Sequence, residues 1–260
     1  MSVTSSGSNS AATGAALSTV AGRIAKFGAI DSTGGGNDLV ITGSAVDYFL
    51  FRGDGALNDG DALRAGGQTN AGGAVLGDTL VVEGDTILTA GNSAFAGFEV
   101  VLLESAVGSA NRTQAPSNAF GNQYNITLSN NNAPTTGALF INGSNLKGAV
   151  ANQNAAEAAV INGAAVTAFG LDITTGNAGD TITLGAMAGR VVSQGGDDTV
   201  IDGAGNDVID TGLGNDTVVL TAGNNQVFDE AGNNNITLGT GNDLIRTGGG
   251  NDTITAAVGN

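Results

Sequence analysis

The chain has 260 residues and a formal net charge of −16, from 24 acidic and 8 basic side chains, and it contains no His and no Cys. So few basic residues argue against a nucleic-acid partner, because phosphate backbones are bound by Lys and Arg. The missing His and Cys exclude disulfides, thiolate sites, His-based metal centres and catalytic triads with a His base. The composition argues against an enzyme and is typical of chains that bind cations or stay solvated.

We expect residues 1–30 to be flexible, or to become ordered only on assembly. Their start, Met1 to Ser8, has no positive charge, and Arg23 and Lys26 come late, so the segment does not resemble a cleaved signal peptide. No part of the chain supplies the roughly 20 uninterrupted apolar residues of a membrane-spanning helix, so we expect no membrane span.

Residues 31–170 are predicted to be β-rich, as a β-solenoid or a β-sandwich-like region. Short apolar runs alternate with Gly and Asn turns, and residues 105–170 contain only three charged side chains. The Ala-rich stretch from Ala151 to Ala168 has a modest helical tendency. Near the start of the region, residues 33–50 fit two units of a nine-residue pattern that returns later, with Asp38 in the sixth position of the first unit.

From Thr175 to Thr255 this nine-residue pattern occurs nine times without an insertion, from TGNAGDTIT to TGGGNDTIT. The eighth residue is β-branched in every unit, and the sixth is Asp in six of the nine. The first six residues favour a tight turn and the last three favour a short strand. Burying one Val or Ile gives roughly 1.5–3 kcal/mol, whereas ordering nine residues costs on the order of 9–18 kcal/mol. The units are therefore predicted to stack on one another.

If two units make one coil, every residue lies above the residue 18 positions away, at a spacing of about 4.8 Å. One column then contains Asp180, Asp198, Asp216, Asn234 and Asp252, and the other contains Gly189, Asp207, Asn225 and Asp243. Stacked carboxylates repel one another by roughly 1–3 kcal/mol. A hard divalent cation between the turns, bound by carboxylate and carbonyl oxygens, would reverse this effect, and calcium prefers such ligands.

These units resemble the glycine- and aspartate-rich nonapeptides of the RTX (repeats-in-toxin) family, G-G-x-G-x-D-x-U-x. The resemblance implies an all-β fold in which residues 171–260 form a calcium-bound parallel β-roll, with calcium-dependent folding and type I secretion. It assigns several Ca²⁺ ions to the sixth-position residues, which are Asp180, Asp198, Asp207, Asp216, Asp243, Asp252, Asn225, Asn234 and Asp38.

The candidate sites differ in strength along the columns. The pairs Asp180/Asp198 and Asp198/Asp216 are intact, whereas Asn225 and Asn234 supply a carbonyl without charge and Gly189 supplies no side chain. We expect weaker sites, or none, beside those rows. A metal-free solenoid with Asn and Asp turn ladders is the alternative.

The function that this pattern favours is a calcium-dependent, extracellular structural protein that assembles into a surface layer, filament or matrix. Outward apolar residues are expected on the strands, and open solenoid ends favour a homo-oligomer. The residues expected to face outward are Ile201, Val219, Leu220, Phe228 and Leu244. The alternative is a calcium-stabilised adhesin or ligand-binding module, with cell-surface polysaccharide as a candidate partner.

Overall fold

The computed structural model describes residues 23–26, 39–41, 47–52, 62–64, 79–83, 86–88, 95–104, 123–134, 137–147 and 156–256. Within these ranges the chain forms β-strands and one 3-10 turn, η3 (Asn130–Asn132), and contains no α-helix. Every pair of neighbouring strands in the two long sheets is parallel, as shown by the register from β13 to β15 and from β14 to β16. The predicted all-β fold with a parallel β-roll is confirmed.

The strands form two long sheets and one short sheet. The ten-stranded sheet has the order β1 (Arg23–Lys26), β3 (Asp47–Arg52), β5 (Thr79–Glu83), β8 (Val100–Glu104), β10 (Leu139–Asn142), β12 (Leu171–Thr174), β14 (Arg190–Val192), β16 (Val208–Asp210), β18 (Gln226–Phe228) and β20 (Leu244–Arg246). The eight-stranded sheet has the order β6 (Thr86–Leu88), β9 (Gln123–Ser129), β11 (Ala158–Ala165), β13 (Thr181–Thr183), β15 (Thr199–Ile201), β17 (Thr217–Val219), β19 (Asn235–Thr237) and β21 (Thr253–Thr255). The short sheet contains β2 (Leu39–Ile41), β4 (Ala62–Arg64) and β7 (Phe95–Ala96).

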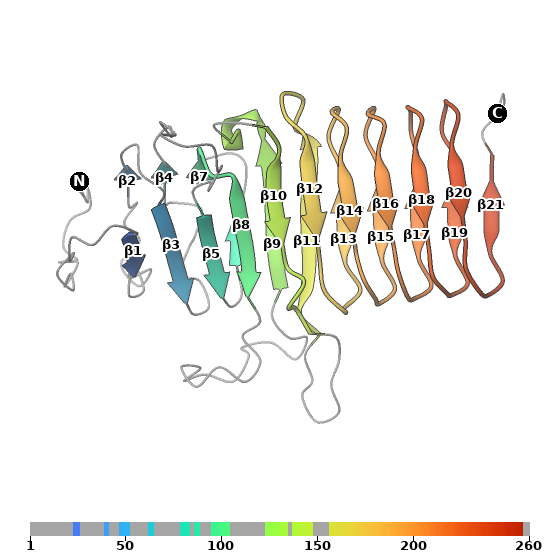
Figure 1. Cartoon of the computed structure of the whole chain (residues 1–260), viewed down its shortest axis with the longest axis horizontal. Coiled ribbons are helices and arrows are strands. Elements are labelled where there is room, and N and C mark those ends of the chain that lie inside the picture. Colours follow the sequence, from blue (N-terminus) through green and yellow to red (C-terminus); the bar gives the residue numbers. More distant parts are fainter. Residues whose placement is uncertain are drawn as a thin grey trace.

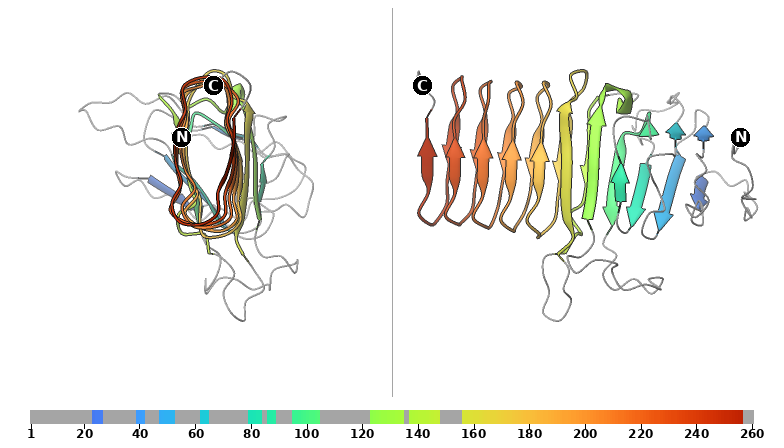
Figure 2. Two further views of the ribbon diagram at one scale, coloured as in Figure 1. Left: turned by 90° about the vertical axis from the view of Figure 1, so that its right-hand side faces the viewer. Right: turned by 180° about the vertical axis from the view of Figure 1, so that it is seen from behind.

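The two long sheets face each other and run along the long axis of the molecule, one coil after another (Figure 1). Seen along that axis, the repeats superimpose as one narrow, flattened coil (Figure 2). In the repeats each strand pairs with the strand 18 residues later, for example Ile182 with Val200 and Val191 with Ile209. The predicted coil of two nonapeptides is therefore the observed one.

The inward side chains of each repeat come from three positions and not from one. The eighth-position Val and Ile residues are buried from Ile182 to Ile236, as predicted. Alternation of the backbone continues beyond the three strand residues, so the sixth and first positions also face the interior. Leu220, which was expected to face outward, occupies a first position and is only 3% exposed. That expectation was wrong, because the residue after the strand is still in the extended alternation.

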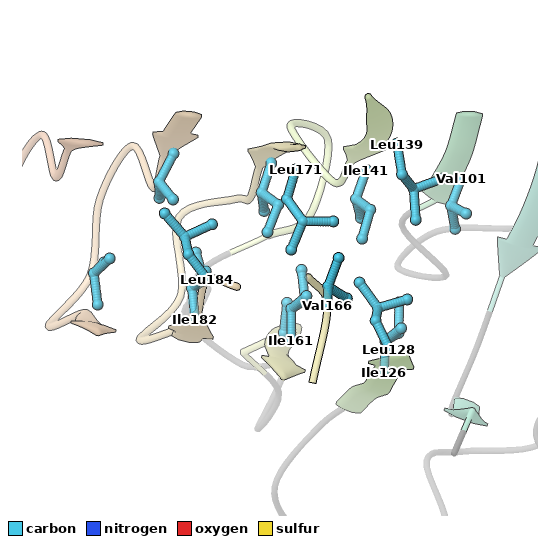
Figure 3. Packing of buried hydrophobic residues seen from close by; sticks show 14 of the residues in the cluster. Val101, Ile126, Leu128, Leu139, Ile141, Ile161, Val166, Leu171, Ile182 and Leu184 are labelled. Carbon is cyan, nitrogen blue, oxygen red and sulfur yellow. The ribbon is translucent and has the colours of Figure 1, made fainter. Parts of the chain in front are cut away.

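Large apolar side chains fill the space between the sheets in the coils that precede the repeats. Leu139, Ile141 and Leu171 from one sheet meet Ile126 and Leu128 from the other (Figure 3). All five are at most 3% exposed. The core continues into the first repeats, where the apolar side chains become smaller and fewer.

Within the Ala-rich segment, Ala158–Ala165 form strand β11 and not the helix that the composition weakly favoured. Ala159 and Ile161 are buried while Val160 is exposed, and the strand pairs with β9 on one side and β13 on the other. The adjacent β-branched residues Val160 and Ile161 favour a strand, and pairing with β9 and β13 stabilises it. Together these effects outweigh the small helical propensity.

Glycine in the fourth position of the repeats lets successive turns approach closely. Gly214 and Gly232 have φ angles of 145° and 146°, which side chains rarely allow. A Cβ atom on Gly232 would lie 1.5 Å from the carbonyl oxygen of Gly214, one coil earlier. The glycine column therefore sets the distance between coils and, with it, the stacking of the aspartates.

Candidate metal centre

The sixth-position side chains form two continuous ladders inside the roll. In the first ladder, one carboxylate oxygen, Oδ1 of Asp198, accepts a hydrogen bond of 2.7 Å from the backbone N–H of Asp180, and Oδ1 of Asp216 accepts one of 2.8 Å from Asp198. The ladder begins at Ala159 of β11, whose N–H donates to Oδ1 of Asp180 at 2.7 Å. The second ladder begins at Gly189, whose N–H donates to Oδ1 of Asp207 at 2.6 Å. The stacked columns predicted from the sequence are thus present.

The second carboxylate oxygen of these aspartates is buried and has no partner. This holds for Oδ2 of Asp180, Asp198, Asp207, Asp216 and Asp243, and for the hydroxyl of Thr175. An ionised oxygen removed from water without a hydrogen bond or a counter-ion is costly, so native proteins rarely contain a row of them. The orphan oxygens therefore indicate a group that neutralises them from inside the roll.

Burial changes the acidity of these carboxyl groups in the absence of a cation. Removal from water raises the pKa of Asp180 to about 7, although the N–H of Ala159 opposes the change. Removal from water raises the pKa of Asp198 to about 8, and the neighbouring charges of Asp180 and Asp216 add to the rise. Burial also raises the pKa values of Asp207 and Asp216. Without a cation, the roll thus disfavours the charged form of its own aspartates.

Asn225 and Asn234 occupy the same columns but make different contacts. The oxygen Oδ1 of Asn234 accepts from the N–H of Asp216 at 2.8 Å, as an aspartate would. Its amide nitrogen, which replaces the orphan oxygen, donates to Oδ2 of Asp229 at 2.7 Å. Likewise the amide nitrogen of Asn225 donates to Oδ2 of Asp202 at 2.9 Å. At these two rows, the side chain that was predicted to bind calcium instead donates its amide N–H to the carboxylate of Asp229 or Asp202.

Sequence reasoning did not single out Asp202 and Asp229, which lie in the first position of their units and are 3% and 8% exposed. The signal was an Asp in a column that otherwise contains Thr, Ser and Leu. Of the remaining predicted ligands, Asp252 accepts from the N–H of Asn234 at 3.0 Å at the end of its ladder. Asp38 lies outside the described residues.

The donor set fits a calcium ion and fits few other ligands. It consists of oxygen atoms alone, which is the ligand set that calcium prefers. Among the described residues, no three acidic side chains gather into one cluster, so the carboxylates are distributed one per row. A cation between rows would then combine carboxylates of neighbouring coils with backbone carbonyl oxygens of the glycine-rich turns.

The comparisons agree with this reading of the repeats. A model of the RTX calcium-binding nonapeptide repeat (4 copies) matches residues 193–227 and 228–260. No curated protein and no solved structure is significantly similar to the chain. In the part of the chain that the structure describes, no helix is long and apolar enough to cross a membrane. Residues 193–260 are RTX calcium-binding nonapeptide repeats, and calcium is the cofactor that such repeats bind at several sites.

Proposed function

We propose that the chain is a secreted structural protein whose roll folds around calcium and whose copies assemble into a cell-surface layer, filament or matrix. The observation that carries the calcium role is the row of buried carboxylate oxygens without partners. Proteins with RTX repeats are typically secreted and extracellular, where calcium is abundant. Calcium supplies positive charge between the coils, and the chain supplies the scaffold.

The proposed ligands are the sixth-position aspartates of both ladders. We assign Asp180, Asp198 and Asp216 to one side of the roll, and Asp207 and Asp243 to the other. Asp252 continues the first ladder, and Asp38 is the equivalent residue of the amino-terminal repeat. The aspartates with a buried second oxygen hold the neighbouring coil through Oδ1 and direct Oδ2 to the cation; they are Asp180, Asp198, Asp207, Asp216 and Asp243.

One face of the roll is suited to contact between copies, because it carries no charge. None of the eight strands of the β6–β21 sheet contains an Asp, Glu, Lys or Arg. In contrast, eight of the ten strands of the other sheet contain at least one. Two copies with a net charge of −16 repel each other least if they approach through the uncharged face.

Apolar exposure and open strand edges support the same proposal. Val160 on the uncharged face is 38% exposed, and Leu213 in a turn is 54% exposed. Among the described residues, β20 and β21 end the two long sheets, and Ile254 of β21 is 50% exposed. Unpaired edge groups and an uncovered apolar side chain are features that a further strand can complete.

Electron microscopy of the purified chain with millimolar calcium and with a chelator tests assembly. Ordered sheets or filaments are expected with calcium, and monodisperse monomers at millimolar calcium would overturn the proposal. Thr217→Lys places a charge in the middle of the uncharged face and should reduce assembly at least several-fold. Gln226→Lys adds the same charge to the opposite sheet and is the control, since Gln226, like the half-buried Thr217, occupies the outward seventh position of its unit.

A second candidate function is a calcium-stabilised adhesin that binds neutral cell-surface polysaccharide. The outward positions of β13 and β21 are all Thr, and those of β19 are Asn235 and Thr237, so the uncharged face presents regularly spaced hydroxyl and amide groups. Co-sedimentation with cell-wall polysaccharide that Thr217→Lys abolishes, without any assembly of the protein alone, would favour this function.

A further inference from the structure

Each asparagine in the metal columns donates to a buried aspartate of the first column. Asp229 belongs to the unit of Asn234, whereas Asp202 belongs to the unit of Asp207, one coil before Asn225, whose own unit begins with Leu220. On the side of the roll that carries Asp198 and Asp216, the first-column residue is a hydroxyl wherever the sixth is Asp: Thr175, Ser193, Thr211 and Thr247. Only where the sixth residue is Asn234 is the first one an aspartate, Asp229. One negative charge is thus kept in that repeat but moved from the sixth position to the first.

The orientation of each amide is determined by its surroundings. Oδ1 of Asn234 faces the N–H of Asp216, and Oδ1 of Asn225 faces the N–H of Asp207 at 2.9 Å. An amide that accepts from a backbone donor on one side must direct its NH₂ group to the other side. That side is the interior, where the aspartates of the other rows place an oxygen without a partner.

Both oxygens of each carboxylate that accepts from these amides have a hydrogen-bond partner. Asp229 accepts from Asn234 at 2.7 Å, from the N–H of Gly248 at 3.2 Å and from the hydroxyl of Thr211 at 3.4 Å. Asp202 accepts from Asn225 at 2.9 Å and from the N–H of Thr221 at 2.6 Å. Neither carboxylate has a buried oxygen without a partner, unlike the five aspartates of the ladders.

We infer that the pairs Asn234–Asp229 and Asn225–Asp202 replace calcium at their rows, so that the roll contains two metal-free links between its calcium sites. An amide nitrogen carries hydrogen atoms and cannot ligate a cation, and the amide oxygen faces a backbone N–H and not the interior. The hydrogen bond from amide to carboxylate offsets part of the cost of burying that charge without an ion. This inference rests on the proposed calcium role of the sixth-position aspartates, and it removes Asn225 and Asn234 from the ligands that the sequence predicted.

A pair of reciprocal swaps tests the inference. Asp229→Thr with Asn234→Asp gives this row the residues of the Thr211/Asp216 row, and it should bind at least one more calcium ion than the wild type. Ser193→Asp with Asp198→Asn makes the opposite change, and it should bind at least one ion fewer. Bound calcium is counted by equilibrium dialysis with metal analysis, and folding is checked by circular dichroism in calcium.

The thermal midpoint supplies a second readout. Chelation should lower the midpoint more in the Asp229→Thr/Asn234→Asp variant than in the wild type, and less in the reciprocal variant. Asn233→Asp is the control for a new carboxylate near the column, because it adds one at the exposed neighbouring position. Its calcium count should equal that of the wild type.

The possible failures are distinguishable. A wild type that binds no calcium would overturn the proposed function. If the wild type binds calcium, then unchanged counts in the folded swaps would overturn only the present inference. Should Asp229→Thr/Asn234→Asp not fold, the reciprocal variant decides, and a wild-type count in that variant contradicts the metal-free links.

Discussion

The strands of residues 123–174 and those of residues 175–255 belong to the same two sheets, but different forces hold them. The earlier coils bury large side chains such as Tyr124, Leu128 and Ile141, all at most 1% exposed. The later coils bury one Val or Ile per unit beside the aspartate ladders, whose second oxygens have no partner. A parallel solenoid can therefore be stabilised by apolar packing or by buried charge that needs a cation, and this chain uses both in succession.

Removal of calcium should separate the two regions most clearly. With a chelator, residues 175–255 should lose protection from hydrogen exchange, because uncompensated aspartate ladders oppose stacking. Residues 123–174 should keep theirs, since their core is apolar. Hydrogen exchange with mass spectrometry measures both regions at once, and equal loss in the two would contradict the division.

Asp198→Ala should be the most damaging single substitution in the roll. It removes the oxygen that holds the N–H of Asp180, and an unsatisfied buried N–H costs about 1–3 kcal/mol. It also removes a proposed ligand between two coils, so calcium affinity should fall at least tenfold. Calorimetry gives the affinity, and an unchanged value would show that the ligand assignment is wrong.

The control is Asp197→Ala, which removes the same charge from an exposed neighbouring position. Oδ1 of Asp197 accepts from the N–H of Asn215 at 2.7 Å at the surface, where water can replace it. Its effect on calcium affinity should be less than threefold.

Leu128→Ala should destabilise the apolar coils regardless of calcium. Leu128 is fully buried, and such truncations cost about 2–5 kcal/mol. The loss of unfolding free energy should be the same with calcium and with a chelator. By comparison, Val218→Ala in the roll should have a measurable effect only in calcium, since the roll is then folded.

Acid should partly substitute for calcium in the roll, with a smaller effect. The pKa values of Asp180 and Asp198 in the folded, metal-free roll are raised by burial to about 7 and about 8, well above the ordinary value of an aspartate. The folded form therefore binds more protons than the unfolded form, and stability is present below pH 4 and lost as the pH rises through 7 to 8.

The measurement is the thermal midpoint in a chelator at pH 4, 6 and 8, which should fall across this series. Asp198→Asn should flatten the dependence because it removes a group whose pKa is raised to about 8 by burial. A midpoint that rises from pH 4 to pH 8 would contradict the assignment of these carboxylates to the interior.

The period of nine and the β-branched eighth position were enough to predict the coil of 18 residues and the stacking of Asp180, Asp198 and Asp216, while the parallel pairing was implied by the resemblance to RTX repeats. What could not be predicted was the extent of the inward alternation, which made Leu220 a core residue. A three-residue strand signal does not show that the residue after it remains extended. Asn234 and Asp229 are each exceptional in their own columns, but the pair was missed because only the fold shows that the first position faces the interior beside the sixth.

The coil of two nonapeptides also determines how the length of the roll can change. Deletion of 18 residues removes one coil and rejoins both sheets in register, because β13 pairs with β15 and β15 with β17 at that spacing. Deletion of nine residues transfers every later strand to the opposite sheet. Arg246 of β20 would then lie on the uncharged face, so the roll can lengthen or shorten by whole coils but not by single repeats.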